Sequence, residues 1–394
     1  MKCRVCSYKN SKEVINLGMQ PLANKYPKNI YEIRNEKKYN LKIFFCKKCK
    51  CAQIKKIIDR KKMFTDYYYL SSVNLGLVNH FKKLANKLKK AKFVVDIGSN
   101  DGILLEPLTK NGIKAIGIDP SINVGNIANK KGLKTIIDFF NKNTVDNILN
   151  QYPNPDIIVA SSIMTHLEKP LEFAKNVKRL LKSNGTLILE IEYLVNFLKN
   201  LEYERFYFDR PFYFSLQSIE NIFKTVDMSL VDVEQINVHG ESLRCYIKNG
   251  KISNKSSICK KIINNESNIL NYDFFKKFNL KIHKESLKMR NKIISFKKKN
   301  QNVIGYGAPA RVATITNFSK INSDLINYII DDSPLKQNRY SPGTHISIVS
   351  KDKLDLNKID IVIVFAYEYF NEIKKNFKSY KIKFFKPIPF RILK

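Results

Sequence analysis

The stretch FVVDIGSNDGILLEPL, residues 93–108, constrains the fold of this chain more than any other feature. A buried apolar run ends at an acidic residue, passes through a glycine-containing turn and continues with the periodicity of a helix. Strands and helices of this kind alternate over residues 76–250, and SLVDVEQINV and SLRCYIKN close the region as a pair of strands. This alternation predicts an α/β fold with parallel strands covered by helices and ligands bound at the carboxyl ends of the strands.

The turn itself favours a cationic nucleoside over a dinucleotide. Gly98 and Gly102 let the backbone approach a ligand closely, and Asp96 can lie beside a positively charged amino-acid group. Asp119 ends the next strand, AIGID, where a carboxylate can accept hydrogen bonds from both hydroxyls of a ribose. A nicotinamide dinucleotide requires G-x-G-x-x-G for its pyrophosphate, whereas this loop has two glycines four residues apart after an acid. We therefore expect S-adenosylmethionine (SAM), which is cationic and carries no phosphate.

A third element of this expected pocket follows the strand TIID. Asp138 offers a carboxylate to an adenine amino group, and Phe139 and Phe140 offer an aromatic face, although both rings can equally pack in the core. The expected cofactor-binding residues are Asp96, Gly98, Asn100, Gly102, Asp119, Pro120, Asp138, Phe139, Phe140 and Ser161.

Two C-x2-C pairs near the amino terminus predict a structural metal site. Cys3, Cys6, Cys46 and Cys49 supply four thiolates, which is enough for a closed tetrahedral Zn²⁺ site that stabilises a small module and does not catalyse. Reduced free thiols are the alternative, because disulfides do not persist in a reducing compartment. Cys51 is a less favoured substitute ligand, and the two remaining cysteines stand alone in the sequence.

Length and charge bound the remaining possibilities. The 394 residues are too many for one hydrophobic core, and no apolar run of transmembrane length or signal peptide is visible, so we expect a soluble cytoplasmic enzyme. The net charge of +35 is typical of nucleic-acid or membrane-surface proteins, but its lysines are spread through every segment. We therefore expect no nucleic-acid partner and no membrane.

The chain resembles the sugar C-methyltransferases that act on nucleotide-linked ketodeoxysugars, such as those that build tetronitrose. The resemblance spans nearly the whole chain and follows an ordered series of motifs: the two cysteine pairs flanking LGMQPLANKY, then YYYLSS, VVDIGSNDGILLEPL, GIDPSINV, HGESLRCY, IGYGAPAR and PIP. It implies a monomer with a zinc-binding module at 1–75, a SAM-dependent methyltransferase domain at 76–250 and a Rossmann-like domain at 251–394.

The resemblance also implies a reaction, used in deoxysugar and surface-polysaccharide biosynthesis. A base removes a proton from a carbon beside a ketone, and the enolate then attacks the methyl group, so the site needs a base and a group that stabilises an oxyanion. His166 in SSIMTHLEKP matches a family histidine beside the reaction centre, and Glu190 and Tyr193 match residues after the fifth strand.

The sharpest departure from the family lies in YFDRPFYFSL, residues 207–216. The family has Tyr-His-Glu-His where this chain has Tyr207, Phe208, Asp209 and Arg210, and arginine cannot accept a proton in proteins. The base for carbon methylation would then be Asp209, His166, Tyr207 or His239, with Arg210 stabilising an enolate or binding a phosphate or carboxylate. If carbanion chemistry is lost, methylation of an oxygen is the alternative.

The HGESLR run and the carboxyl-terminal region supply the candidate substrate contacts. His239, Ser242 and Arg244 match a family His-Gly-Gly-Ser-Leu-Arg run, in which Glu241 replaces the second glycine. The loop IGYGAPAR can bind an anion at a helix start, as part of a sugar-nucleotide site or as the remnant of a structural Rossmann-like lobe. The candidate substrate-binding residues are Glu190, Tyr193, Ser242, Arg244, Arg311, Lys336 and Arg339. A NAD(P)-dependent sugar oxidoreductase and a non-enzymatic scaffold are further alternatives.

Overall fold

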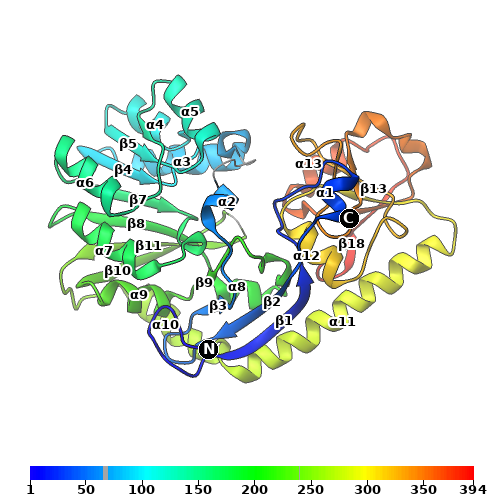
Figure 1. The fold of residues 1–394 in the computed structure, drawn as a ribbon, viewed down its shortest axis with the longest axis horizontal. Helices are drawn as coiled ribbons and strands as arrows, with labels where there is room; N and C mark the ends of the chain where they lie inside the picture. The colour runs from blue at the N-terminus through cyan, green and yellow to red at the C-terminus, as the bar shows by residue number, and fades with distance from the viewer. Residues whose placement is uncertain (65–69, 239) are drawn as a thin grey trace. The chain divides into compact units, whose positions relative to one another are not determined.

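The computed structural model describes residues 1–64, 70–238 and 240–394 (Figure 1). The chain forms two compact units, each assembled from three separate segments. Unit 1 comprises Met1–Lys12, Phe44–Asn196 and Arg210–Asn271, and unit 2 comprises Glu13–Ile43, Phe197–Asp209 and Tyr272–Lys394. The domain boundaries expected from the sequence, 1–75, 76–250 and 251–394, stay predictions.

Unit 1 contains a seven-stranded sheet in the order β10-β11-β8-β7-β4-β5-β6. Its five parallel strands are β4 (Phe93–Ile97), β5 (Lys114–Ile118), β6 (Thr135–Ile136), β7 (Ile157–Ser161) and β8 (Thr186–Glu192). The hairpin of β10 (Met228–Ile236) and β11 (Ser242–Asn249) adds two antiparallel strands beside β8. This is the predicted arrangement of five parallel strands and a closing hairpin, which confirms the α/β fold class.

Local sequence explains why these elements form. All five residues of β4 are buried, as a parallel strand covered on both faces requires. Asn74 and Asn141 cap the two helices that follow them, and Pro170 begins a third helix, where a missing N–H costs nothing. The helices are α3 (Leu75–Lys87), α4 (Leu105–Lys110), α5 (Ile122–Lys130), α6 (Lys142–Gln151) and α7 (Pro170–Leu180).

Several short elements of unit 1 lie outside the main sheet. Strand β3 pairs antiparallel with β9, although 157 residues lie between the two strands in the sequence. A short 3-10 turn, η2, follows β7. The bounds are α2 (Arg60–Phe64), β3 (Ala52–Ile54), η1 (Ser71–Val73), η2 (Met164–His166), β9 (Phe212–Tyr213), α9 (Leu216–Lys224) and α10 (Ser257–Ile269). Helix α8 (Leu194–Lys199) begins in unit 1.

Unit 2 contains a second seven-stranded sheet, in the order β14-β15-β13-β12-β16-β17-β18. Its central strands β15, β13, β12, β16 and β17 are parallel, and antiparallel strands stand at both edges. The strands are β12 (Val303–Tyr306), β13 (Tyr328–Ile330), β14 (Arg339–Tyr340), β15 (Ser347–Val349), β16 (Ile361–Val364), β17 (Lys383–Lys386) and β18 (Arg391–Leu393). A Rossmann-like lobe is thus present, as the second glycine loop predicts.

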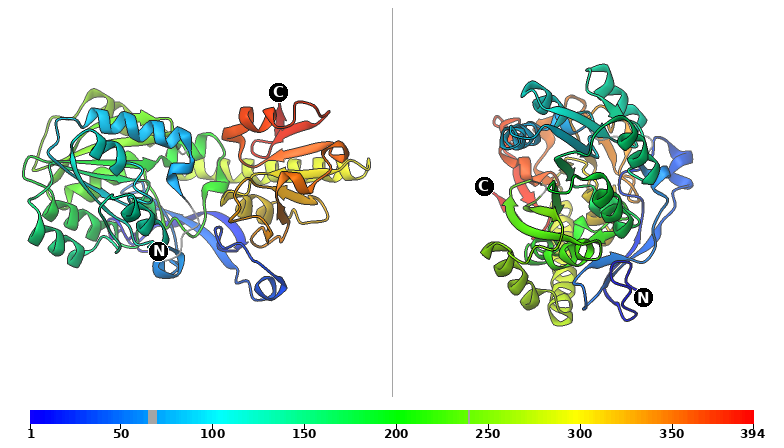
Figure 2. Two further views of the ribbon diagram at one scale, coloured as in Figure 1. Left: turned by 90° about the horizontal axis from the view of Figure 1, so that it is seen from above. Right: turned by 90° about the vertical axis from the view of Figure 1, so that its left-hand side faces the viewer.

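The helices of unit 2 include α11, the long yellow helix in Figures 1 and 2, which contacts β12. The bounds are α1 (Ile30–Arg34), η3 (Tyr203–Arg205), α11 (Tyr272–Lys297), α12 (Arg311–Phe318) and α13 (Phe370–Lys375), together with most of β1 (Lys12–Gln20) and β2 (Tyr39–Phe45).

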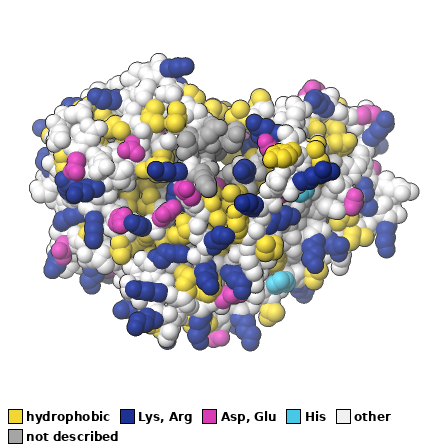
Figure 3. Space-filling view, viewed as in Figure 1, with side chains coloured by type: hydrophobic (Ala, Val, Ile, Leu, Met, Phe, Trp, Pro, Cys, Tyr) yellow, Lys and Arg dark blue, Asp and Glu magenta, His cyan; other side chains and the backbone are white. Residues whose placement is uncertain are grey.

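Basic side chains are spread over the face of the molecule drawn in Figure 3 instead of gathering in one patch. This spread matches the even distribution of lysine along the sequence. Within the described ranges, none of the helices has both the length and the apolar character needed to cross a bilayer.

Candidate functional site

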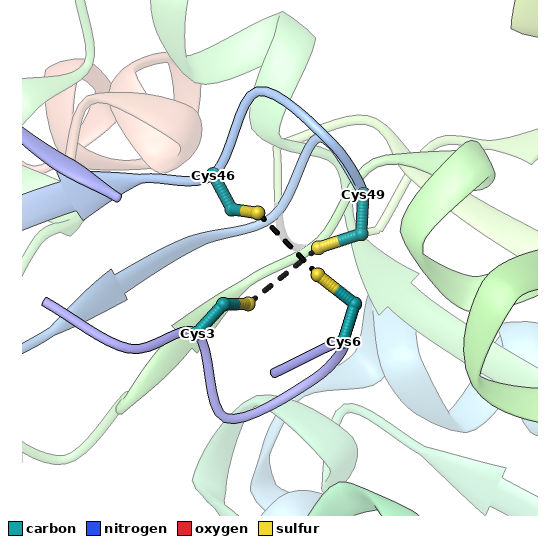
Figure 4. Close-up of side chains that lie close together, drawn as sticks. All are labelled: Cys3, Cys6, Cys46 and Cys49. Atoms are coloured by element: carbon teal, nitrogen blue, oxygen red, sulfur yellow. Dashed lines mark hydrogen bonds between the residues drawn. The ribbon is translucent and has the colours of Figure 1, made fainter. Parts of the chain in front are cut away.

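The four predicted metal ligands lie together in unit 1. The sulfur atoms of Cys3, Cys6, Cys46 and Cys49 are all within 4.8 Å of one another, with 3.6 Å between Cys3 and Cys49 and 3.5 Å between Cys6 and Cys46 (Figure 4). Four thiolates around Zn²⁺ at about 2.3 Å place neighbouring sulfurs about 3.8 Å apart. The donor set and its dimensions therefore fit a closed structural zinc site.

The two cysteine pairs use the same turn. Ser7 and Lys50, each following the second cysteine of its pair, adopt left-handed φ angles of 58°, and their N–H groups donate to the carbonyls of Cys3 and Cys46 at 2.9 Å. This geometry directs both thiols of a pair to one point. The thiol of Cys51 lies outside the set and faces backbone carbonyls, including that of Tyr213 at 3.7 Å.

Two glycines of the expected cofactor loop are sterically required. Gly98 has a φ of 78°, and a Cβ placed on it would lie 2.1 Å from Cγ2 of Ile163. Gly102 has a φ of 84°, and its Cβ would lie 2.5 Å from a methyl group of Leu133. Both positions therefore need a residue without a side chain.

Asp96 is the one acid of this loop whose carboxylate has no hydrogen-bond partner among the residues the structure describes. It is the second-last residue of β4, and 4% of its surface is exposed. Burial, with smaller contributions from the charges of Asp119 and Glu190, raises its pKa to about 8. Burying an ionised carboxylate without a partner costs free energy, so the Asp96 carboxylate is suited to bind the positively charged end of the expected ligand.

Asp119 is oriented by the same loop. Its two carboxylate oxygens accept hydrogen bonds from the backbone N–H groups of Asn100 and Ser121, both at 2.9 Å. Burial raises the pKa of Asp119, and these two bonds oppose that effect. Pro120, which lies between Asp119 and Ser121, is half-buried.

The side chains of Asn100 and Asp101 bind the segment that precedes α3. The amide oxygen of Asn100 accepts a hydrogen bond from the Ser71 N–H at 2.9 Å, and Asp101 accepts bonds from the N–H and hydroxyl of Ser72. Asn100 thus contacts the expected pocket through its backbone N–H, which donates to Asp119, while its side chain binds the backbone of Ser71. Residues 65–69 of that region lie outside the described part of the chain.

The third expected element is used mainly for local structure. The exposed Asp138 accepts hydrogen bonds from the Phe139 N–H at 2.7 Å and from the Thr144 hydroxyl at 3.2 Å, so it supports the start of α6. The ring of Phe140 packs edge-on against Phe173 of α7, with centroids 5.5 Å apart. Packing, one of the two roles expected for these rings, therefore applies to Phe140.

Glu190, two residues before the end of β8, is the centre of a buried charge network. Its carboxylate contacts His80 Nε2 at 2.9 Å, Arg244 Nε at 2.8 Å and the Ser161 hydroxyl. Burial alone would raise its pKa, but the hydrogen bond and charge of His80 and the charge of Arg244 lower the pKa to about 2. Arg244 also binds Glu234 at 3.1 Å, so both residues have internal partners.

The other two candidate substrate residues in unit 1 also bind internally. The hydroxyl of Ser242 donates to the carbonyl of Val238 at 2.9 Å, within the hairpin turn. Tyr193 is buried against Glu266, which raises the pKa of the phenol beyond the effect of burial. Position 239, the predicted His239, lies outside the described residues.

His166 lies on a turn that packs against both the cofactor loop and the segment after Arg210. It ends η2, where its N–H donates to the carbonyl of Ile163 at 2.9 Å, and Ile163 is the residue against which Gly98 lies. The same turn contacts β8 and β9, and β9 begins two residues after Arg210. The imidazole is half-buried.

Asp209 and Arg210 each form a hydrogen bond with a residue that was not among the candidates from the sequence. Asp209 accepts a hydrogen bond from the Asn24 amide at 2.7 Å, within unit 2. Arg210 donates to Glu192 at 2.5 Å, within unit 1, and only 8% of Arg210 and 1% of Glu192 is exposed. Glu192 follows Glu190 by two residues on β8, so the E-x-E pattern was the one available signal. Tyr207 is half-buried.

The candidate cations of unit 2 have partners too. Arg311 binds Glu368 at 2.7 Å and stacks over Tyr367. Lys336 lies 3.8 Å from Asp331, and Arg339 Nη1 donates to the carbonyl of Tyr26 at 3.3 Å.

A backbone N–H of the second glycine loop is also already hydrogen-bonded, because Ala308 N–H donates to the carboxylate of Asp331 at 2.6 Å. A dinucleotide phosphate would need such N–H groups. This contact disfavours the oxidoreductase alternative.

Comparison with known protein families gives three matches along the chain. Residues 3–64 match a zinc binding domain, residues 69–233 a methyltransferase domain and residues 237–389 a C-methyltransferase C-terminal domain. The C-methyltransferase NovU from Streptomyces niveus is 25% identical over 98% of this chain and 95% of its own length. The ubiquinone biosynthesis O-methyltransferase of Azorhizobium caulinodans is 26% identical over 33% of this chain and 55% of its own length.

Among solved structures, the SAM-bound magnesium protoporphyrin IX methyltransferase of Synechocystis is 14% identical, with a TM-score of 0.34 over 45% of this chain and 82% of its own. The matches to methyltransferase domains and to NovU, with the four clustered cysteines, agree on both expected cofactors. The chain is a SAM-dependent methyltransferase with an N-terminal zinc-binding domain, and its residues 237–389 match the C-terminal domain of C-methyltransferases.

Proposed function

We propose that this enzyme methylates a carbon beside the ketone of a nucleotide-linked deoxysugar, in the biosynthesis of a surface polysaccharide. The C-methyltransferase C-terminal domain and the similarity to NovU over nearly the whole chain support methylation of carbon. The nucleotide-sugar substrate rests on the ordered motifs from LGMQPLANKY to PIP. The cytoplasmic location and the monomeric state stay predictions.

One observation carries the cofactor assignment: the carboxylate of Asp96, near the end of β4, is buried and has no hydrogen-bond partner among the described residues. Asp96 would bind the amino-acid end of SAM and Asp119 its ribose, while Gly98 and Gly102 allow close approach of the backbone. When bound, SAM supplies an electrophilic methyl group on a positively charged sulfur. The acids that surround this position favour a cation and repel a phosphate.

We assign His166 as the base and Arg210 as the group that stabilises the enolate oxygen. The turn η2 supports this pairing, because it contacts both the loop of Gly98, through Ile163, and strand β9, which follows Arg210. A neutral imidazole can accept the proton from the carbon, whereas Arg210 stays positive and can stabilise the developing oxyanion. The remaining candidates, Tyr207, Asp209 and His239, can orient the sugar hydroxyls or return a proton.

The diphosphate of the substrate is assigned to unit 2, at the loop 305–311 and the side chains of Arg311, Lys336 and Arg339. Each of these cations has an internal partner, so a diphosphate would have to replace the contacts with Glu368, Asp331 or the Tyr26 carbonyl. Glu190, Tyr193, Ser242 and Arg244 are assigned to the support of the site, because their contacts are internal.

The test is exchange of the proton beside the ketone. Wild-type enzyme with S-adenosylhomocysteine and a ketosugar nucleotide in D₂O should incorporate deuterium at that carbon, and labelled SAM should then transfer its methyl group there. His166→Ala should slow exchange by roughly 100-fold or more, while the exposed control His283→Ala should not. Methyl transfer to oxygen without carbon exchange would refute the proposal, and unchanged exchange in the His166 variant would remove it as the base.

A further inference from the structure

We propose that Gln53 is a positioning residue that couples the zinc site to the catalytic segment around Arg210. This inference rests on the proposed role of Arg210 in catalysis. The zinc-binding cysteines, Gln53 and the segment 210–214 all belong to unit 1.

The side chain of Gln53 has one orientation that satisfies its surroundings. Its amide oxygen accepts a hydrogen bond from the Arg4 N–H at 3.2 Å, between the two cysteines of the first pair. Because the oxygen is used in this way, the NH₂ group points to the Cys3 sulfur, to which it donates at 3.1 Å. Gln53 is fully buried, so neither bond is exchanged with water. An N–H donor to a thiolate stabilises its negative charge and fixes the direction of the metal ligand.

The backbone around Gln53 holds the chain just after Arg210. Gln53 pairs with Phe212 in the β3–β9 ladder, and the Ile54 N–H donates to the Pro211 carbonyl at 3.0 Å. The guanidinium of Arg4 reinforces this strand through a bond to the Ile54 carbonyl at 2.7 Å. The residues that bind the metal and those that follow Arg210 are therefore one hydrogen-bonded assembly.

The other side of this segment is attached to the carboxyl end of β8, where Glu192 lies. The Leu194 N–H donates to the Phe214 carbonyl at 3.0 Å, while Arg210 donates to Glu192. Strand β9 thus lies between the zinc-binding module and the end of β8, and it also contacts η2, the turn of His166. If β3 moves, β9 loses one of its two supports, and the guanidinium of Arg210 moves with it.

Gln53→Met tests this coupling because methionine keeps the length of the side chain but cannot donate to sulfur. We expect the variant to release zinc to a chromogenic chelator roughly 10- to 100-fold faster than wild type. Amide hydrogen exchange should become faster in peptides containing 52–54 and 211–214 and stay unchanged at 93–97 in β4. Turnover should fall, while the affinity for S-adenosylhomocysteine stays within about twofold. The matched control is Gln235→Met, an exposed glutamine on β10, which should change none of these quantities.

Faster zinc release with unchanged exchange at 211–214 would overturn the coupling, and so would wild-type rates of zinc release in Gln53→Met. If the variant does not fold, chelation of the wild-type holoenzyme replaces it: 211–214 should then lose protection while 93–97 keeps it. Equal loss in both peptides, or retained protection at 211–214, would again overturn the inference. The exchange measurements need no sugar substrate, so failure to methylate any ketosugar would count against the proposed function and leave this inference to be judged separately.

Discussion

Binding of the cofactor should release a proton near neutral pH, and Asp96 should be its source. With a pKa of about 8 in the unliganded protein, the carboxyl is about one tenth ionised at pH 7. A positively charged amino group beside it stabilises the ionised form. At pH 7, ionisation therefore costs about 1.4 kcal/mol, and the affinity should be about tenfold weaker than at a pH above 8.

The assay is calorimetric titration of S-adenosylhomocysteine at pH 7 in phosphate and in Tris, whose ionisation enthalpies differ. The difference in observed enthalpy should correspond to release of about 0.9 proton per site. Asp96→Asn should bind more weakly and release no proton, whereas the exposed control Asp227→Asn should behave as wild type. Equal enthalpies in both buffers for wild type, or an unchanged proton release in Asp96→Asn, would refute the reasoning.

The same carboxyl should affect the stability of the unliganded protein. Because its pKa is raised in the folded state, Asp96 contributes stability below about pH 4, and this contribution is lost as the pH rises through about 8. Urea denaturation without ligand should therefore give a lower free energy of unfolding at pH 9 than at pH 6. The decrease should be smaller in Asp96→Asn.

Three further predictions follow from other parts of unit 1. Gly98→Ala should lower the free energy of unfolding by roughly 2–4 kcal/mol in urea denaturation, because its Cβ would overlap Ile163 at a positive φ; a smaller loss would show that the turn adapts. Glu266 has a pKa raised to about 7 by burial, so its contribution to stability is lost as the pH rises from about 4.5 through 7; Glu266→Gln should flatten this part of the stability curve, and an unaltered curve would contradict the assignment. Cys46→Ser should bind less than one zinc per chain by elemental analysis and lower the melting temperature, whereas Cys245→Ser should retain the metal; full zinc occupancy in Cys46→Ser would exclude the four-thiolate site.

The parts of the fold with a strong local signal could be predicted from the sequence. The apolar run of β4, the glycines that follow it and the two cysteine pairs each restrict the backbone through a few neighbouring residues, and they led to the sheet, the cofactor and the zinc site. Strand β9 was missed because it has two residues and pairs with β3, far away in the sequence. Its existence depends on the tertiary partner and not on its own pattern.

The candidate site was less predictable for the same reason. Asn24 and Asp209 are 185 residues apart, and no periodicity relates them. Sequence reasoning identified Arg210 as a replacement for a histidine, but it could not supply the buried carboxylate of Glu192 that keeps this cation in place. For Phe140 the sequence allowed either packing or ligand contact, and it could not supply the contact with Phe173 that the structure adds.

The pairing of β3 with β9 bears on how the amino-terminal module is completed during synthesis. All four metal-binding thiols are available once the first 49 residues have left the ribosome, but the strand that covers the edge of β3 is made more than 150 residues later. In that interval a zinc-loaded nascent chain presents free backbone donors and acceptors at β3, a surface to which other extended chains can add. Residues 1–64 expressed alone would keep this open edge permanently, so we expect such a fragment to bind zinc and to self-associate.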